Sequence, residues 1–326
     1  MTVPRRAWLI IRFLLPASIL LYIFSILPLS DVLATIAATR WALVVVALPL
    51  VLLGPLLSAA RLKILTNALA MSLSVREITE VNFITRFYGL ALPGQLATGA
   101  IRWLRLTRIE DRKTGVLAAI LFSRLLHLLA LGSLGAVFYA LDLPAMGQAF
   151  SLIGLLLLLG ALSLGMLLLA LANRSPLAQS VEAMGSLRRV VSTVRRFRDL
   201  SRASLSLAMG FSLAENLAAT VVMYLLAQAV GASVPFVSLG WIRATVQLLI
   251  QLPISISGLG VREGGLLIAL EPYGVAGSSA VALSLLIFGV ILLVGLIGGV
   301  LELRGILLAE EGGVRKSAAD RRRRVH

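Results

Sequence analysis

The sequence predicts an all-α polytopic membrane protein with about six full spans and two re-entrant hairpins in an inverted-topology repeat. Hydrophobic residues form 59% of the 326-residue chain, and the mean hydropathy of +0.98 lies far outside the range of soluble globular proteins. A Leu-Pro pair followed by arginine, nine residues after the proline, occurs twice, at Pro93–Arg102 and Pro253–Arg262. Matched interruptions of apolar segments in two halves of a chain are typical of a transporter's substrate site.

The full spans follow from length and from the positions of the basic residues. About 20 apolar residues cross a bilayer, and loops rich in lysine and arginine stay cytoplasmic. The basic clusters all fall on segments that can share one side, so both termini are expected to be cytoplasmic. The net charge of +15 then reflects topology and attraction to anionic lipid head groups, and no nucleic-acid partner is expected. The expected spans are 8–29, 41–60, 115–141, 149–172, 203–230 and 278–302.

Two further apolar stretches, 77–101 and 236–272, do not fit as single spans. Basic clusters flank 77–101 on both sides, and the stretch is too short to cross twice. The stretch 236–272 lies between spans that both end outside. Each is expected to be a re-entrant hairpin, because non-helical backbone at membrane depth survives only inside protein or along a wet cavity. The expected hairpin tips contain Pro93, Gly94, Gly99, Pro253, Ser255, Ser257, Gly258 and Gly260.

The order span–hairpin–span over 41–141 recurs upside down over 203–302. We expect one membrane-embedded domain, residues 1–310, followed by a basic cytoplasmic tail, 311–326. The alternative is eight plain helices with incidental kinks, which gives the two Leu-Pro motifs no reason to coincide.

The last span contains Gly295-x-x-x-Gly299, a pattern that lets helices approach closely. Packing inside the bundle is the favoured interpretation, and a homodimer seam is the alternative. The oligomeric state is not fixed by this motif. The arginine-rich segment 174–202 is either an amphipathic helix on the inner surface or a solvated loop.

Charged residues inside apolar runs are candidate site residues, because ionisable groups at membrane depth face the bundle interior and mark pathways. A guanidinium can grip phosphate with two parallel hydrogen bonds. Arg262 on the outer hairpin has Glu263 as a competing structural partner, and Arg102 could instead be an ordinary positive-inside anchor. The candidate ligands of a lipid phosphate are Arg262, Arg102, Arg124 and Arg86.

Glu215, Glu263 and His127 are candidates for balancing charge or carrying a proton. Arg124 and His127 are three residues apart on one helix face, and Glu215 lies in the corresponding helix of the second repeat. Either Arg124 holds phosphate while Glu215 takes up a proton, or these two residues form a buried structural pair. His127 is either a satisfied core histidine or a proton carrier.

No cofactor, metal site or catalytic residue is expected. The chain has no cysteine, only two histidines, and no Gly-x4-Gly-Lys-Ser/Thr loop. Two other functions remain open. A membrane-embedded enzyme acting on lipid phosphates would use the same arginines with Glu215 or Glu263 as acid and base. A non-catalytic accessory subunit of a lipid-modifying system is the other.

The segments FYGLALPGQLATGAIRWLRL (87–106) and QLPISISGLGVREGGLL (251–267) resemble the two signature regions of the lysylphosphatidylglycerol synthase membrane-domain family. The resemblance implies a flippase-like protein of the prokaryotic cytoplasmic membrane. It would move an anionic or modified lipid, phospho- or isoprenoid-linked, between leaflets. Members fused to an aminoacyl-lipid synthase carry a cytosolic domain that has no counterpart in this sequence, so no aminoacyl transfer is implied.

Overall fold

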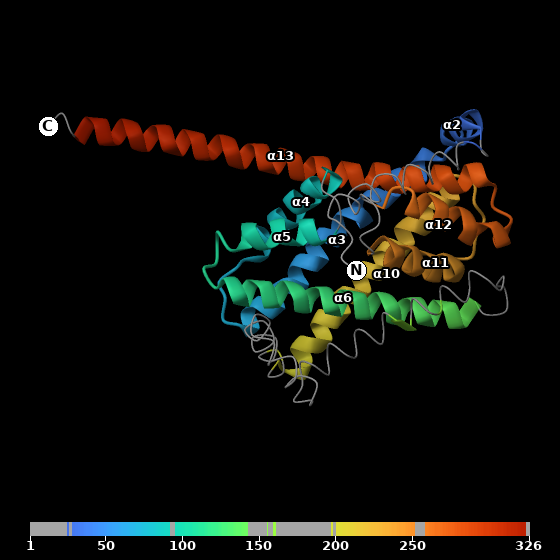
Figure 1. Cartoon of the computed structure of the whole chain (residues 1–326), viewed down its shortest axis with the longest axis horizontal. Helices are drawn as coiled ribbons and strands as arrows, with labels where there is room; N and C mark the ends of the chain where they lie inside the picture. The colour runs from blue at the N-terminus through green and yellow to red at the C-terminus, as the bar shows by residue number, and fades with distance from the viewer. Residues whose placement is uncertain are drawn as a thin grey trace, which may run out of the picture.

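The computed structural model describes residues 28–91, 95–142, 200–251 and 258–323, with a few isolated positions between them. These residues form helices and their connections, and the part of the chain that is described contains no strand, which confirms the predicted all-α class. Figure 1 shows the long helices lying across one another in a bundle, with the C-terminal helix running well beyond it.

Long apolar helices match four of the predicted spans. They are α3 (Trp41–Ala68), α6 (Lys113–Asp142), α10 (Arg202–Ala229) and the Gly277–Leu307 part of α13 (Gly277–Arg323), and each is long and apolar enough to cross a membrane. Large apolar side chains such as Val46, Val137 and Val300 are exposed on these helices, as lipid contact requires. The predicted spans 8–29 and 149–172 lie almost entirely outside the described residues.

Helix α3 extends beyond the predicted second span. We expected 41–60 because Arg61 and Lys63 follow the apolar run, whereas α3 continues to Ala68. The Arg61 guanidinium donates hydrogen bonds to Ser123 and Ser212 on neighbouring helices, so its charge is accommodated within the buried part of α3. This extension of α3 brings Arg61 into the interior of the bundle, where it is 3% exposed.

Each stretch predicted as a hairpin contains two shorter helices that pack on each other. The first pair is α4 (Val75–Ala91) and α5 (Gln95–Leu106), and the second is α11 (Phe236–Gln251) and α12 (Val261–Leu270). A 3-10 turn, η3 (Glu271–Tyr273), follows α12, and a short helix, α2 (Leu29–Ala37), precedes α3. Both breaks between paired helices, 92–94 and 252–257, lie outside the described residues, with the tip residues Pro93, Gly94, Pro253, Ser255 and Ser257.

The remaining predicted tip glycines are described. Gly258 and Gly260 have φ values of 79° and 78°, in the left-handed region that glycine adopts without steric cost. They form the turn that leads into α12, and the Gly260 N–H donates to Glu263 Oε2 at 2.6 Å. Gly99 lies within α5.

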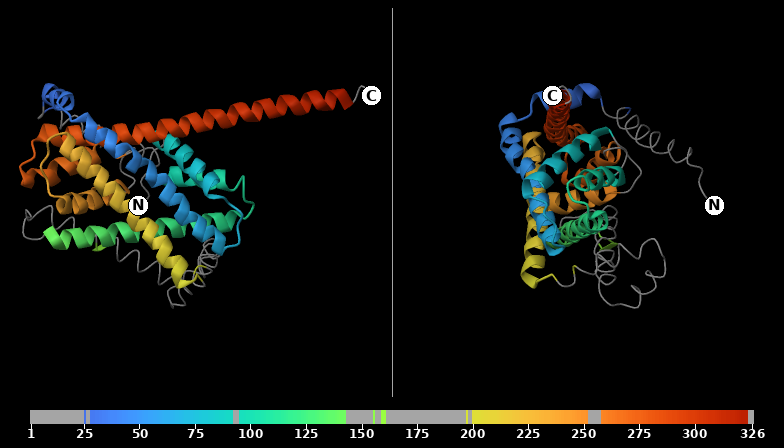
Figure 2. Two further views of the ribbon diagram at one scale, coloured as in Figure 1. Left: turned by 180° about the vertical axis from the view of Figure 1, so that it is seen from behind. Right: turned by 90° about the vertical axis from the view of Figure 1, so that its left-hand side faces the viewer.

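Helices of the two halves of the chain pack against each other. The helices α3 and α10 pack along each other, and the Arg40 N–H at the start of α3 donates to the Ala229 carbonyl at the end of α10. The first arm of each pair packs on the last long helix of the other half: α4 on α13, and α11 on α6. Figure 2, seen from behind, shows α3 and α10 lying side by side.

Glycines on α13 permit its close approach to α4. A Cβ added to Gly298 would lie 2.0 Å from the Phe83 carbonyl oxygen, and one added to Gly295 would lie 2.5 Å from Leu90 Cδ1. The same side of α13 carries Gly299, where an added Cβ would meet the Phe87 ring at 2.9 Å. The glycine motif therefore packs inside the bundle, as we favoured. At the contact between α11 and α6, Gly240 lies against the Phe138 ring of α6.

Candidate functional site

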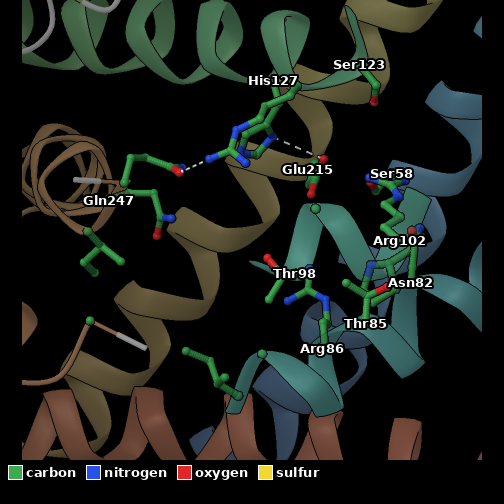
Figure 3. A pocket seen from close by; sticks show the side chains of 18 of the residues that line it. Ser58, Asn82, Thr85, Arg86, Thr98, Arg102, Ser123, His127, Glu215 and Gln247 are labelled. Atoms are coloured by element: carbon green, nitrogen blue, oxygen red, sulfur yellow. Dashed lines mark hydrogen bonds and ion pairs between the residues drawn. The ribbon is translucent and has the colours of Figure 1, made fainter. Parts of the chain in front are cut away.

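A cavity of about 410 Å³ lies at the centre of the bundle, and side chains from both halves line it. The predicted residues Arg86, Arg102, Arg124, Arg262, His127 and Glu215 all contribute to its wall, as do Gly99 and Gly258. Figure 3 shows polar side chains converging on this space from several helices. The other polar lining residues are Ser58, Arg61, Asn82, Thr85, Thr98, Ser123, Gln247 and Gln251.

Glu215 on α10 is paired with Arg61, and the Arg124–Glu215 pair that we kept as an alternative is not formed. Arg61 Nη1 donates to Glu215 Oε2 at 2.6 Å, and His127 Nδ1 lies 3.3 Å from the same oxygen. The Arg61 guanidinium also donates to hydroxyl groups of three neighbouring serines, Ser58, Ser123 and Ser212. Its charge is thus neutralised and its donors are occupied.

Arg61 was missed because it follows an apolar run and was interpreted as a cytoplasmic flank. Arg243 on α11 was also missed. Its Nε donates to Thr220 Oγ1 at 2.9 Å and its Nη2 to Asn216 Oδ1 at 3.0 Å. Arg243 stands inside the apolar stretch 236–251, so the rule that identified Arg86 would have found it.

Arg124 and His127 share a face of α6, as predicted, and both line the cavity. Arg124 Nη2 donates to Gln251 Oε1 at 2.8 Å, which joins α6 to the end of α11. His127 Nδ1 lies 3.5 Å from Asn216 Nδ2 as well as near Glu215. The imidazole therefore stands between the carboxylate and the network of Arg243.

Arg262 reaches the cavity but is held firmly by its neighbours. It is 3% exposed; its Nε donates to Ser284 Oγ at 2.8 Å and its Nη2 to Glu263 Oε1 at 3.2 Å. Ser284 in turn donates to the same Glu263 oxygen at 2.7 Å. The guanidinium carbon also lies 5.6 Å from the centre of the Phe288 ring. This closed network fixes the turn at Gly258–Gly260 on the start of α12.

Arg86 on α4 and Arg102 on α5 differ from the other cavity arginines. Neither makes an ion pair or hydrogen bond with any described residue, and the Nε and Nη2 atoms of Arg102 are buried without a partner. Arg86 lies in the cavity wall with an exposed side chain, although α4 packs between α3 and α13. Both side chains appear in Figure 3 on the α3–α5 side of the cavity, with Gln247 on the other side. Arg86 and Arg102 therefore present two guanidinium charges to the same cavity.

The family assignment agrees with this architecture. A model of the lysylphosphatidylglycerol synthase transmembrane region matches residues 9–299 of the chain. The chain belongs to this family. No curated protein matches the sequence. Membership in the lysylphosphatidylglycerol synthase transmembrane family shows that this is a multi-pass membrane protein and points to a function connected with membrane lipids.

In this family member, two buried carboxylates fasten opposite ends of the bundle. At the end of α6, Asp142 Oδ2 accepts hydrogen bonds from Trp241 Nε1 at 2.8 Å and from the Tyr273 hydroxyl at 2.6 Å. Burial raises the pKa of Tyr273 to about 12, and the bond to Asp142 acts in the same direction, so the phenol keeps its proton. This group, the Asp142 cluster, joins α6 to both α11 and η3.

The second carboxylate is Glu302 near the other end of the bundle, on α13. Its Oε1 accepts a hydrogen bond from the Tyr88 hydroxyl at 2.9 Å and forms an ion pair with Arg105 Nη2. This group, the Glu302 cluster, joins α13 to α4 and α5. Each cluster thus ties the last long helix of one half to the helix pair of the other half.

The connection between α5 and α6 is fixed by charged residues outside the long helices. Arg112 donates from Nη1 to the Leu69 carbonyl at 2.9 Å and from Nη2 to the Ala70 carbonyl, both at the end of α3. Glu110 accepts from Arg112 Nε at 2.9 Å and from the Ser72 N–H. The hydrogen bond from Arg112 holds the pKa of Glu110 below its usual value.

The lining offers little for metal-dependent chemistry. Within the described ranges, no group of three or more histidine, cysteine, aspartate or glutamate side chains lies close enough to hold a metal ion. Glu215 is the one carboxylate among the cavity residues named above, and Arg61 engages it. The cavity is therefore rich in fixed positive charge and is suited to bind an anion.

Proposed function

We propose that this protein moves an anionic or modified lipid, phospho- or isoprenoid-linked, between the leaflets of the cytoplasmic membrane. The observation that supports this most strongly is a pair of guanidinium groups, Arg86 and Arg102, that have no partner among the described residues and line a cavity shared by both halves of the bundle. A cavity of about 410 Å³ is large enough for a lipid head group. The acyl chains would stay in the hydrocarbon while the head group passes.

The energetic argument concerns what an arginine needs at membrane depth. A charged side chain near the centre of a bilayer costs at least about 2.5 kcal/mol when it is not compensated. Arg61 and Arg262 have carboxylate partners, but Arg86 and Arg102 have none among the described residues. A phosphate that enters the cavity would supply the missing charge and accept their hydrogen bonds. The binding energy would come from these two guanidinium groups, which have no partner among the described residues.

The exchange of partners between the halves supports an inverted repeat. If 41–141 and 203–302 are equivalent, α3 corresponds to α10, α4 to α11, and α6 to α13. A twofold axis through the α3–α10 contact then converts the α4–α13 contact into the α11–α6 contact, and both are observed. In this arrangement the stretches 77–101 and 236–272 are re-entrant hairpins from opposite faces, as broken helices around a transporter site often are.

Alternating access would use the two ends of the bundle in turn. The Asp142 and Glu302 clusters join a helix pair to the last helix of the other half, one at each end. Opening one end would separate that helix pair from the long helix while the other cluster stays closed. Glu215 with His127 lies between them beside the cavity and is our candidate for taking up a proton or balancing the charge of the substrate.

The test is lipid exchange in liposomes that contain only the purified protein. A fluorescent anionic phospholipid is reconstituted, and the rate at which it reaches the outer leaflet is followed with a membrane-impermeant quencher. We expect the parent protein to accelerate exchange, Arg102→Ala to slow it about tenfold or more, and Arg304→Ala, on the exposed surface of α13, to keep the parental rate.

The same vesicles separate the alternatives. Mass spectrometry of the recovered lipid would show a new product if the protein were an enzyme acting on lipid phosphates. A protein that neither exchanges nor changes the lipid would be an accessory subunit. Arg102→Ala should also retain the thermal stability of the parent, since the lost guanidinium has two buried atoms without partners. Fast exchange by Arg102→Ala would remove this residue from the substrate site.

A further inference from the structure

The charges around the cavity can be divided into those that the protein itself neutralises and those that it does not. Arg61 is paired with Glu215 at 2.6 Å, and Arg262 with Glu263 at 3.2 Å. Each pair is nearly buried, with side-chain exposures of 4% and 12% in the first and 4% and 2% in the second. These pairs contribute no net charge to the cavity.

Arg86 and Arg102 are cavity arginines with neither a carboxylate nor a hydrogen-bond partner among the described residues, whereas Arg124 donates to Gln251 Oε1. Neither is within salt-bridge distance of a carboxylate anywhere in the described ranges. They come from α4 and α5, the two arms of one helix pair, so a single group in the cavity can meet both. Two positive charges in one cavity favour a ligand that brings two negative charges, because a half-neutralised site keeps one guanidinium without a counter-charge.

We propose that the cavity selects lipids whose head group ends in a terminal phosphate, a phosphomonoester or diphosphate, over lipids whose phosphate is an internal diester. This specificity rests on the proposed transport function and names the substrate class. A phosphomonoester carries about −1.5 to −2 charges at pH 7, whereas a diester carries one. The doubly charged head group matches the two arginines, and the singly charged one leaves one of them unpaired.

The number of phosphate oxygens that can accept hydrogen bonds also favours a terminal phosphate over a diester. A guanidinium binds a phosphate best through two parallel hydrogen bonds. A terminal phosphate has three oxygens that are free of ester bonds, enough to be shared between two guanidinium groups. A diester has two such oxygens, and its second ester arm occupies one side of the phosphorus.

The neutral neighbours and the carboxylate are consistent with a small anionic group. Thr85 donates its hydroxyl hydrogen to the Val81 carbonyl at 2.7 Å, and Asn82 donates to the Pro55 carbonyl at 2.9 Å. Neither residue adds a negative charge. An ammonium on the head group would need a carboxylate, but Glu215 is already held by Arg61 and stands beside His127. Aminoacylated head groups therefore fit this cavity less well than a bare phosphate.

The experiment compares two lipids with identical short acyl chains, dioctanoyl phosphatidic acid and dioctanoyl phosphatidylglycerol. Each is titrated into the purified full chain in detergent, and binding is followed by tryptophan fluorescence at pH 8 and at pH 5. We expect phosphatidic acid to bind about tenfold more tightly or better at pH 8. The preference should shrink to about twofold at pH 5, below the second phosphate ionisation at about pH 6.

Variants then connect this preference to the two arginines. Arg86→Gln should weaken phosphatidic acid binding about tenfold and change phosphatidylglycerol binding by less than about threefold, which removes the preference. Arg304→Gln, an equally conservative change at an exposed position, should leave both affinities unchanged. The comparison of the two lipids on the parent protein is decisive by itself if Arg86→Gln does not fold.

The outcomes separate the specificity from the transport function. Equal binding of both lipids at pH 8, with exchange of both in liposomes, would overturn the preference for a terminal phosphate and leave the transporter standing. Tighter binding of phosphatidylglycerol would overturn it in the same way. Failure to bind or to exchange either lipid would reject the proposed function itself.

Discussion

The contact between α13 and α4 makes Gly298→Ala the most severe small substitution that the structure offers. The new Cβ would lie 2.0 Å from the Phe83 carbonyl oxygen, whereas real Cβ contacts essentially never fall under 3.0 Å. The helices must therefore separate by about 1 Å, and no side-chain rotation can relieve a clash with backbone. Forced overpacking typically costs about 1–3 kcal/mol, and we expect the upper end of this range. The better helix propensity of alanine offsets about 0.5–1 kcal/mol of it.

Gly289→Ala is the matched control, because the same helix offers open space around Gly289. With about 2 kcal/mol lost, the apparent melting temperature of Gly298→Ala should fall by about 4–8 °C, while that of Gly289→Ala should hold or rise. Heating the proteins in detergent and measuring the remaining monodisperse fraction by size-exclusion chromatography tests this. If the two variants melt together, α13 and α4 do not approach as closely as the structure shows.

Three further predictions concern the site and its supports. Because Arg262 holds the turn before α12 through Ser284 and Glu263, Arg262→Ala should lower the melting temperature and slow lipid exchange in liposomes, and Arg262→Lys should do both to a smaller extent. Because the chain has no cysteine, Gly99→Cys gives a single thiol in the cavity. Asp142→Asn and Glu302→Gln each weaken the cluster at one end of the bundle. Combined singly with Gly99→Cys, they should raise the rate at which an impermeant thiol reagent labels the cysteine, one from each side of the vesicle membrane. The lowered pKa of Glu110 stabilises the fold above the unfolded value of about 4.3, and this contribution is lost as pH falls further. The melting temperature of Glu110→Gln should therefore fall less than that of the parent as the pH is lowered. An equal fall in both proteins would contradict this prediction.

Much of the architecture could be predicted from the sequence because hydrophobic length and charge placement are one-dimensional signals. Both helix pairs were located by the interruptions at Pro93 and Pro253, although the exact turns lie outside the described residues. Helix ends were harder. Arg61 looked like a boundary because charge usually marks one, but three serines and Glu215 satisfy it inside the bundle.

The ion pairs around the cavity could not be determined from the sequence. The charged residues of the cavity lining, Arg61 apart, were identified in advance, since Arg86 and Arg124 are conspicuous in apolar surroundings and Arg102 follows a Leu-Pro motif. Which carboxylate meets which arginine depends on the rotation of helices that are far apart in the chain, and helical spacing alone does not fix this. Glu215 lies 154 positions from its partner Arg61. The adjacent Glu263, by contrast, could be named as a partner of Arg262 directly from the sequence, and it is one.

The two Leu-Pro motifs end in the same residue type but in different chemistry, and the next residue explains the difference. Arg262 is followed by Glu263, which neutralises it and caps the Gly260 N–H. Arg102 is followed by Trp103, whose indole nitrogen donates to the Lys113 carbonyl, and no carboxylate in the described ranges pairs with the Arg102 guanidinium. In the inverted repeat that we propose, the position of a charge is thus kept while its role changes. In the second half the arginine stabilises a turn, and in the first half we propose that its charge is available to a substrate.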